Sequence, residues 1–421
     1  MGKRENEIIS FSFSVLLIAP LYPSVLALKI WSEIMDSTKS KIEPIWTTID
    51  EKTTYPIYIG TDIISEFGTI FKEHLPRCSQ ALLVTNQTIE EVHAAKISQI
   101  SESLASIGVD LIVEAIPEGE RTKSYWGLGM LYDFFAEHQL DRQSVIIAMG
   151  GGVIGDLAGF AASTFLRGLP LVHIPTTLIA QADSSLGGKV AINLARVKNI
   201  VGGFYHPKMI CIDASFLQTL NARELRAGLA EVVKYAVIMD SELFNYLEAN
   251  VENIIAKDPD VLEKLVRRCC EHKIAVVEED PEERTDRRAI LNYGHTIGHA
   301  LESLYHRYLH GEAVSVGMVA ASYLAVKTEI LPLADAERQS KLLSRIGLPT
   351  DALGVSIDPL LQPMLHDKKR RGNTLRFILP TKIGDITIKD VLKNDLPDLL
   401  QYLVEKQIFS PSEDATATEE G

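Results

Sequence analysis

The chain has 421 residues, which is too long for one ordinary hydrophobic core and predicts two domains. Hydrophobic residues make up 46% and charged residues 23%, a balance that excludes an intrinsically disordered chain. The formal net charge of -14 argues against a general nucleic-acid surface, because phosphate backbones require clustered positive charge. An acidic protein can still bind a small anion in a cleft that gathers Lys and Arg side chains.

The first segment admits two interpretations. Residues 8–28 carry no charge and follow Lys3 and Arg4, as in a signal peptide or a short membrane anchor. Pro20 and Pro23 interrupt this stretch, which weakens a single spanning helix. The alternative is that translation begins at Met35 and that the printed sequence starts too early. Because nothing else in the sequence indicates export, we favour the second interpretation and expect residues 1–45 to be an extension outside the fold.

The cysteines indicate a reducing compartment. They form no CxxC pair, and two of them are adjacent, which is a poor start for a disulfide framework. We interpret all four as small buried residues with reduced thiols and expect a cytoplasmic protein without membrane association: Cys78, Cys211, Cys269 and Cys270.

Residues 46–220 predict a Rossmann-like α/β domain. Short runs rich in Val, Ile and Leu are typical of buried strands, and they fall at residues 56–60, 81–86, 109–117, 144–150, 169–177 and 209–214. Amphipathic helical patterns lie between several of these runs, for example at 62–75 and 124–140. Alternation of this kind predicts a parallel sheet with helices on both faces.

Residues 221–405 predict a mostly helical second domain. Nearly every segment from 223 to 346 has helical periodicity. Two later runs, 375–380 and 385–390, indicate a small hairpin around a Gly-Asp turn. The polar, acidic residues 406–421 are expected to be a disordered tail.

A glycine-rich turn follows the predicted strand at 144–150. Gly150, Gly151 and Gly152 allow a close backbone approach, and the helix that follows offers free N–H groups to a pyrophosphate. The spacing is not GxGxxG, so a tight strand-to-helix turn that needs small residues remains an alternative.

Two further loops carry polar side chains after predicted strands. One follows the strand at 169–177 and contains Asp183 and, after two glycines, Lys189. The other contains Glu120 and Lys123. The carboxyl ends of parallel strands are where α/β sheets bind ligands, so both loops are candidates for a site.

Three histidines and one carboxylate in the helical half predict a metal site. His295 and His299 share a helix face at i, i+4, and His310 begins the next helical run. Glu231 lies in an otherwise apolar helix, where a buried carboxylate requires a partner. One carboxylate with imidazoles suits zinc, and spacing alone favours the pair His295 and His299.

Seven motifs in order resemble the 3-dehydroquinate synthase family over about residues 56–390: GGGVIGDLAGFAASTFLRG, IPTTLIAQADSSLGGK, KNIVGGFYHP, AGLAEVVKY, LNYGHTIGHALE, HGEAVSVGM and DKK. The resemblance implies a phosphorus-oxygen lyase that uses NAD and Zn²⁺, with Co²⁺ as an alternative metal. The implied reaction converts 3-deoxy-D-arabino-heptulosonate 7-phosphate to 3-dehydroquinate and phosphate with transient NAD reduction. It belongs to the shikimate pathway, which leads to chorismate and the aromatic amino acids.

The resemblance also implies roles for individual residues. The metal ligands are Glu231, His295 and His310, while His299 binds substrate, since HTIGH lacks the Glu of HExxH. The implied NAD contacts are Glu120, Lys123, Gly151, Gly152, Val153, Asp156, Thr176, Thr177, Lys189, Lys198, Thr219 and Glu224. The implied substrate contacts are Asp183, Lys189, Lys198, Asn199, Lys234, Lys273, Arg288, Asn292, His299 and Lys368. Arg167 resembles an arginine that reaches across a dimer interface to the substrate phosphate bound by the other subunit, which implies a homodimer.

The chain departs from the family pattern at two loops. Asn86 and Thr88 stand where an Asp and an Asn usually contact the adenine ribose, which bears on the choice of NAD over NADP. Residues 285–287 stand where a glycine is common, just ahead of Arg288 and Asn292. Together with Lys273, these two residues are expected to face the substrate carboxylate. Alternatives to the cyclase are a cyclase of another sugar phosphate, a polyol dehydrogenase of the same plan, and a non-catalytic NAD-binding protein.

Overall fold

The computed structural model describes residues 42–51, 53–194, 197–366 and 374–411. Expectations for residues 1–41, for Lys368 and for the tail at 412–421 fall outside this part of the chain. Within it, no helix is both long enough and apolar enough to span a bilayer.

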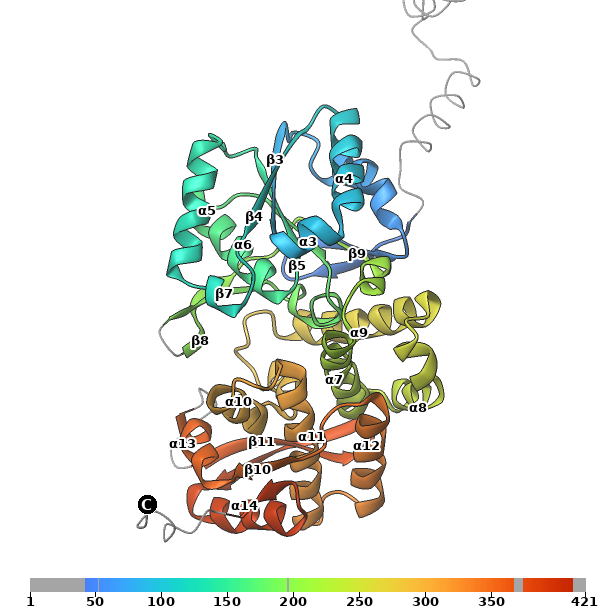
Figure 1. Ribbon diagram of the computed structural model, residues 1–421, viewed down its shortest axis with the longest axis vertical. Coiled ribbons are helices and arrows are strands. Elements are labelled where there is room, and N and C mark those ends of the chain that lie inside the picture. The colour runs from blue at the N-terminus through green and yellow to red at the C-terminus, as the bar shows by residue number, and fades with distance from the viewer. Residues whose placement is uncertain (1–41, 52, 195–196, 367–373, 412–421) are drawn as a thin grey trace, which may run out of the picture.

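A seven-stranded sheet forms the core of the first half (Figure 1). Neighbouring strands are parallel except for β1, which pairs antiparallel with β2. In spatial order the strands are β1 (Ile45–Thr48), β2 (Thr54–Gly60), β9 (Met209–Asp213), β6 (Leu171–Pro175), β5 (Val145–Gly150), β3 (Gln80–Asn86) and β4 (Asp110–Ile116). The central strands are buried along their whole length, as parallel strands covered on both faces must be. The predicted parallel-sheet domain is therefore confirmed.

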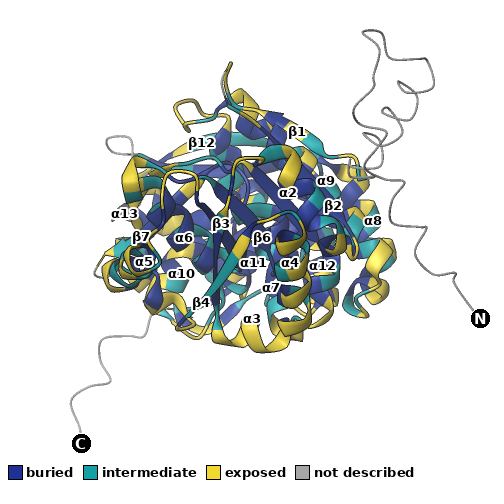
Figure 2. Ribbon diagram, turned by 90° about the horizontal axis from the view of Figure 1, so that it is seen from above, coloured by how far each residue is buried: buried dark blue, intermediate teal, exposed yellow. Residues whose placement is uncertain are grey.

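Helices cover both faces of this sheet, and each face has its own apolar cluster. Phe67, Phe71 and Ile100 pack on one face, and Leu131 and Leu157 on the other. Figure 2 shows the buried strands in the middle of the molecule and the exposed outer sides of helices around them. The helices of this half are α2 (Phe67–His74), α3 (Gln87–Val92), α4 (Ala94–Ser106), α5 (Tyr125–Glu137) and α6 (Gly152–Thr164).

An antiparallel hairpin, β7 (Lys189–Leu194) with β8 (Val197–Phe204), projects from this half and was not predicted. The backbone of Asn193 donates to the carbonyl of Lys123, at 2.9 Å, which anchors the hairpin beside the start of α5. Every residue of β8 is exposed. The hairpin thus brings Lys189, Lys198 and Asn199 away from the sheet and toward the second half of the molecule.

The second half is mostly helical, as predicted. Its helices are α7 (Ala222–Met239), α8 (Ser241–Ile255), α9 (Pro259–Glu279), α10 (His295–Leu304), α11 (His310–Lys327), α12 (Leu333–Ile346), α13 (Asp358–His366) and α14 (Leu396–Glu405). Side chains of Asn221, Asp240 and Asp258 accept hydrogen bonds from the first turns of α7, α8 and α9, which fixes where these helices begin.

Two small strand pairs complete this half. The predicted hairpin is present as β11 (Thr374–Lys382) with β12 (Asp385–Leu392). β10 (Ala352–Ser356) pairs in parallel with β13 (Phe409–Ser410), which lies within the segment expected to be a disordered tail. Phe409 is buried, and burial of this ring accounts for the ordered backbone there.

Helix α7 joins the two halves. Its side chains are buried on nearly every face, and they belong to one apolar cluster that also contains Ile57 and Ile210 of the sheet. The first turn of α11 packs so closely on α7 that a Cβ on Gly311 would lie 1.9 Å from the carbonyl oxygen of Ala227. Only glycine permits this approach, and it places His310 next to Glu231.

Candidate active site

The glycine turn lies at the carboxyl edge of the sheet, next to the point where the strand order reverses between β3 and β5. Gly151 precedes the first turn of α6, where no side chain caps the helix, so its free N–H groups face this edge. A Cβ on Gly152 would lie 3.2 Å from the hydroxyl of Ser184. The hydroxyls of Ser184 and Thr176 are buried and make no hydrogen bond within the described chain. Unpaired hydroxyls beside an open helix N-terminus suit the pyrophosphate of a dinucleotide.

Other predicted cofactor contacts gather beside this turn. Lys123 is buried and contacts both Asp156 of α6 and Asn199 of β8. Burial raises the pKa of Asp156, although Lys123 opposes the effect. Glu120 accepts a hydrogen bond of 2.8 Å from the side chain of Asn193. Of the remaining predicted cofactor contacts, Val153 lies in the first turn of α6, and Thr177 follows β6 and accepts from the Ala180 N–H at 3.2 Å.

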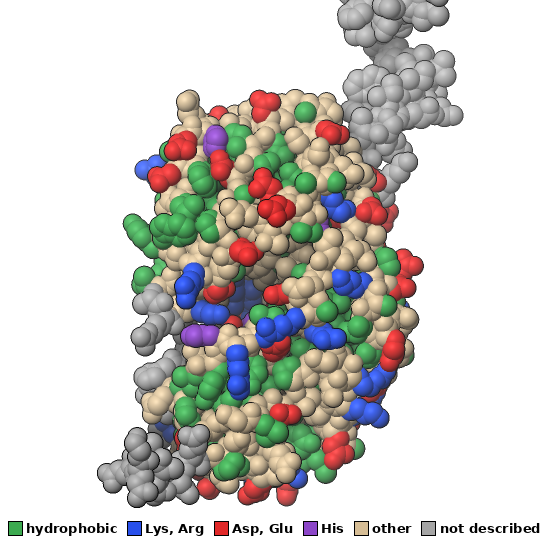
Figure 3. Space-filling view, viewed as in Figure 1, with side chains coloured by type: hydrophobic (Ala, Val, Ile, Leu, Met, Phe, Trp, Pro, Cys, Tyr) green, Lys and Arg blue, Asp and Glu red, His purple; other side chains and the backbone are tan. Residues whose placement is uncertain are grey.

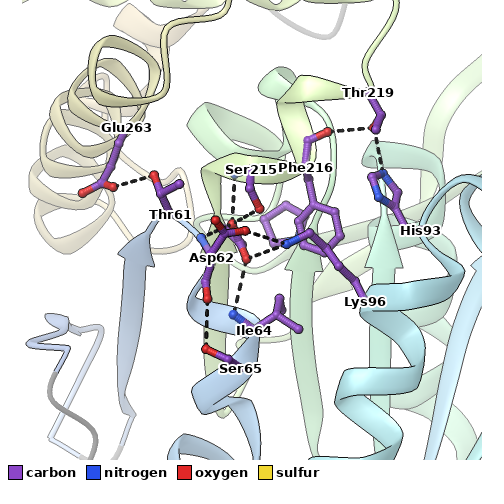
Figure 4. A network of polar contacts seen from close by, with 12 residues as sticks. Thr61, Asp62, Ile64, Ser65, His93, Lys96, Ser215, Phe216, Thr219 and Glu263 are labelled. Carbon is purple, nitrogen blue, oxygen red and sulfur yellow. Dashed lines mark hydrogen bonds and ion pairs between the residues drawn. The ribbon is translucent and has the colours of Figure 1, made fainter.

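Two predicted contacts, Thr219 and Glu224, follow β9 in the chain, and Figure 4 shows Thr219 beside His93. The hydroxyl of Thr219 donates to the carbonyl of Phe216 at 3.0 Å and lies 3.0 Å from Nε2 of His93. Lys96 pairs with the buried carboxylate of Asp213 at 3.3 Å in the same network. Glu224, in the first turn of α7, is half-buried, and burial raises its pKa.

A carboxylate that sequence reasoning missed lies beside the loop after β3. Asn86 uses its side-chain oxygen to accept from Ile89 N–H at 2.9 Å, so it caps α3. Thr88 donates to the carboxylate of Glu118, which comes from the loop after the neighbouring strand β4. A carboxylate is therefore present beside this loop although Asn86 replaces the usual Asp. Only the pairing of β3 with β4 reveals this, because residues 88 and 118 are far apart in the sequence.

Glu231, His295 and His310 form one group whose donor atoms all lie within 4.8 Å of one another. Nε2 of His295 lies 3.6 Å, and Nε2 of His310 3.4 Å, from the same oxygen of Glu231. Glu231 is fully buried, and neither of its carboxylate oxygens accepts a hydrogen bond within the described chain. Lys234 pairs with it as an ion. An orphaned carboxylate facing two imidazole nitrogens fits a divalent metal ion.

Electrostatics keeps this group charged in the absence of metal. Burial would raise the pKa of Glu231, but Lys234 and the two histidines hold it well below its usual range. Burial would lower the pKa of His310, but the neighbouring carboxylates of Glu231 and Glu302 raise it to about 10. Metal binding therefore has to displace a proton from His310.

His299, which spacing paired with His295, lies beside this group. The ring centroids of His295 and His299 are 5.1 Å apart, but His299 is exposed and belongs to a second set of donors with Glu302 and His310. Helical spacing could not separate these sets, because Glu231 and His310 come from other helices.

Asp183 is the centre of a second buried network. It lies in an irregular helical turn, η4 (Ala180–Ser184), that follows β6. Nζ of Lys273 donates to its backbone oxygen at 2.6 Å and contacts its carboxylate, and Lys234 pairs with it at 3.5 Å. Burial would raise the pKa of Asp183, but these two lysines hold it below its usual range. The hydroxyl of Tyr235 donates to it at 2.9 Å; this fully buried tyrosine was not predicted to belong to the site.

Arg288 and Asn292 come from one short turn, η6 (Arg288–Asn292). Arg288 is almost fully buried, and its guanidinium donates to the carbonyl of Pro281 at 2.7 Å. The unusual loop before it is held by Asp280, which accepts from the backbone N–H groups of residues 284, 285 and 288. The loop therefore reaches Arg288 without the glycine that is common in the family.

The remaining predicted cations are more exposed. Lys189 pairs with Glu283 at 2.6 Å and Lys198 with Glu302 at 2.7 Å, in each case joining the β7–β8 hairpin to the helical half. Figure 3 shows Lys, Arg and His side chains gathered around a hollow between the two halves of the molecule. Arg167 is apart from this cluster: it is exposed in the turn η3 (Phe165–Arg167), with a left-handed φ of 68°.

Comparisons with known proteins agree with this geometry. Residues 113–227 match the family described as 3-dehydroquinate synthase N-terminal, and residues 228–370 match 3-dehydroquinate synthase C-terminal. A 3-dehydroquinate synthase of Desulforamulus reducens is 48% identical over 347 residues, which is 82% of this chain and 95% of the relative. One from Picosynechococcus is 41% identical over 82% of this chain and 94% of the relative.

Solved structures with the same fold include other cyclases. A 2-deoxy-scyllo-inosose synthase, solved with carbaglucose-6-phosphate, NAD+ and Co2+, is 26% identical with a TM-score of 0.75, over 87% of this chain and 100% of that one. The 2-epi-5-epi-valiolone synthase ValA of Streptomyces hygroscopicus, with NAD+ and Zn2+, is 27% identical with a TM-score of 0.76, over 85% and 99%. An alcohol dehydrogenase from Oenococcus oeni, 16% identical with a TM-score of 0.60 over 86% and 99%, shares the fold alone. The family matches and the identity to curated relatives lead to one conclusion: this chain belongs to the 3-dehydroquinate synthase family.

Proposed function

We propose that this chain converts 3-deoxy-D-arabino-heptulosonate 7-phosphate to 3-dehydroquinate and phosphate, a step of the shikimate pathway. The observation that carries the proposal is the juxtaposition of the group Glu231, His295 and His310 with the buried network around Asp183. Lys234 belongs to both, since it pairs with Glu231 and with Asp183. The relatives named 3-dehydroquinate synthase support the same activity.

The site fits NAD and one divalent metal ion. When bound, NAD would take up and return a hydride, and the metal would polarise a substrate hydroxyl oxygen. The glycine turn after β5 and the hydroxyls of Thr176 and Ser184 would hold the pyrophosphate, and Glu231, His295 and His310 would hold the metal. We infer zinc, with cobalt as the alternative, because one carboxylate and two imidazoles are a zinc-type ligand set that leaves a position open.

The chain's own cations bind and orient a substrate that carries both a carboxylate and a phosphate. Lys273 and Arg288 are buried and suit the carboxylate, because charge-assisted hydrogen bonds are strong where water is excluded. The more exposed Lys189 and Lys198 suit the phosphate, which departs with the electron pair of the broken C–O bond and so gains negative charge. Asp183, held ionised by Lys234 and Lys273, fixes the positions of both ammonium groups. Orientation of the open intermediate favours ring closure over side reactions.

A pair of substrates tests this assignment against other sugar phosphate cyclases. Sedoheptulose 7-phosphate has the same carbon number but no carboxylate, so Lys273 and Arg288 would lose their anion. Each charge-assisted hydrogen bond contributes about 1.5–3 kcal/mol. We therefore expect kcat/KM for phosphate release to be at least about 10²-fold higher with the heptulosonate phosphate. Equal or better turnover of sedoheptulose 7-phosphate would reassign the substrate but leave the cyclase chemistry in place.

We further infer that the active protein is a homodimer. Exposed apolar side chains lie together where the β7–β8 hairpin meets the start of α5, and Figure 3 shows hydrophobic side chains along this edge. Trp126, in the first turn of α5, is 59% exposed, and Leu194 and Val197 of the hairpin are 53% and 50% exposed. Contiguous exposed apolar surface marks interaction sites, and the resemblance of Arg167 to a residue that crosses a dimer interface makes a second copy the partner.

Trp126→Glu is expected to convert the dimer to a monomer in sedimentation at micromolar concentration, because a carboxylate would be buried without a partner. Leu353→Glu, at an equally exposed leucine on β10, is the matched control and should leave the dimer intact. Arg167→Ala should keep the dimer but lower activity. A monomeric wild type, or full activity of Arg167→Ala, would contradict the proposed interface.

We also propose a cytoplasmic location. All four cysteines are buried and free, as is typical of proteins that fold in a reducing compartment. Recovery of the protein from the membrane or secreted fraction of its native cells would contradict this.

A further inference from the structure

Glu302 is neither a proposed metal ligand nor a proposed substrate contact, yet it contacts a residue of each kind, His310 and Lys198. It lies on α10, seven residues after His295, so both side chains fall on one face of that helix two turns apart. One carboxylate oxygen lies 3.2 Å from Nδ1 of His310 on α11, and the other accepts from Nζ of Lys198 on β8 at 2.7 Å. Its side chain is only 13% exposed, so water competes weakly for these bonds.

The contact with Glu302 determines which nitrogen of His310 is free. A neutral imidazole carries its proton on one nitrogen and a lone pair on the other. Because a carboxylate accepts, the neutral, metal-binding form of His310 keeps its proton on Nδ1, toward Glu302, and its lone pair on Nε2. Nε2 is the atom that faces Glu231, at 3.4 Å.

His295 is fixed in the same way by the backbone. Its Nδ1 lies 2.9 Å from the carbonyl oxygen of Tyr293, which can only accept, so the lone pair of His295 also lies on Nε2. That atom is 3.6 Å from Glu231. Both histidines thus present Nε2 to the carboxylate of Glu231. The carbonyl of Tyr293 orients His295, and the carboxylate of Glu302 orients His310.

We propose that Glu302 is a positioning residue for the metal site: it holds His310 in the tautomer that presents Nε2, and it joins that ligand to Lys198 of the hairpin. The proposal rests on the proposed function, since it assumes a metal at Glu231, His295 and His310. Carboxylate partners of ligating histidines orient the ring and increase its basicity.

Through its interaction with Lys198, the carboxylate of Glu302 also links the two halves of the molecule. Lys198 comes from the first half of the molecule and His310 from the second, so Glu302 ties the position of a proposed cofactor and substrate contact to that of a metal ligand. Loss of the carboxylate is therefore expected to weaken metal and NAD binding together. Lys198→Gln should weaken NAD binding and leave metal affinity within about threefold.

The test measures metal affinity of the metal-free, full-length protein by competition with a chromophoric chelator, for Zn²⁺ and for Co²⁺. Glu302→Gln keeps the shape but removes the charge, and is expected to weaken Zn²⁺ binding by about 10- to 100-fold. Glu302→Asp should recover part of the loss. Glu312→Gln is the matched control: Glu312 lies two residues after His310 and pairs with Arg223, so it reports a general loosening of α11 and should change Zn²⁺ affinity less than about threefold.

A second readout does not depend on bound metal. Nitrogen chemical shifts of neutral His310 in ¹⁵N-labelled, metal-free protein should show the proton on Nδ1 in the wild type and divided between the Nδ1 and Nε2 tautomers in Glu302→Gln. Unchanged Zn²⁺ affinity and an unchanged tautomer in Glu302→Gln would overturn the role of Glu302 alone. A wild-type protein that binds no divalent metal would instead overturn the metal site of the proposed function, and the proposal for Glu302 with it.

Discussion

His295→Ala is expected to abolish stoichiometric metal binding and to lower kcat by at least about 10³-fold. His295 is buried and contributes one of the two imidazole nitrogens that face Glu231. Its removal leaves one imidazole and one carboxylate, too few ligands to hold zinc tightly. A bound metal contributes several kcal/mol to stabilisation of developing charge, and each 1.4 kcal/mol corresponds to a factor of ten in rate. Metal content by atomic absorption and phosphate release by a colorimetric assay measure the two effects.

His306→Ala provides the control for this prediction. His306 is exposed and lies outside both groups of metal donors in the described chain, so its loss should leave metal content and kcat near those of the wild type. Full metal content in His295→Ala would show that the metal lies elsewhere. If His295→Ala and His306→Ala both lost metal content and kcat to the same extent, the cause would be a general instability of the segment between α10 and α11.

Lys234→Met is expected to lower the free energy of unfolding of the metal-free protein by about 3–5 kcal/mol. Lys234 is almost fully buried between the carboxylates of Glu231 and Asp183, and Glu231 has no exposed surface. Methionine would fill a similar volume but leave buried negative charge without a partner. Urea unfolding followed by circular dichroism measures the change, and Lys264→Met, at an exposed lysine on α9, should change stability by less than about 0.5 kcal/mol.

The loss in Lys234→Met should depend on pH and on metal. In the wild type, the folded-state pKa of Glu231 lies below its unfolded value, so its contribution to stability is present above about pH 4.3 and falls at lower pH. Without Lys234 that pKa rises, so the deficit of the variant should be largest near neutral pH and shrink as the pH falls. Saturating Zn²⁺ should restore part of the stability, because metal binds the folded state. A deficit independent of pH and of metal would show that lost packing, not uncompensated charge, is its cause.

The sequence predicted the sheet well because its strands are buried. All six apolar runs between residues 56 and 214 became β2, β3, β4, β5, β6 and β9. The β7–β8 hairpin was missed because β8 is exposed throughout, so its residues show no alternation of apolar and polar side chains. The short strands β10 and β13 were missed because they depend on partners distant in sequence, such as Phe409 beside Ala352. β1 was missed although it pairs with the adjacent strand β2, because its four residues are too few to show a pattern.

Prediction of the site from sequence depended on resemblance more than on spacing. Helical spacing grouped His295 with His299, because periodicity relates only residues of the same helix. The close approach of α11 to α7 at Gly311 brings His310 to Glu231, and it is a property of tertiary packing. Tyr235 and Glu302 lie within recognised motifs, yet their contacts with Asp183 and His310 are visible only when the helices are placed together.

The most direct test of the proposed function follows phosphate and NADH together. Purified protein with the heptulosonate phosphate, NAD and Zn²⁺ is predicted to release stoichiometric phosphate with no net rise in absorbance at the NADH band, because the hydride returns to the substrate within each cycle. A strong chelator should stop phosphate release. Net NADH without phosphate would contradict the proposed function and indicate a dehydrogenase, the activity named for a structure of the same fold.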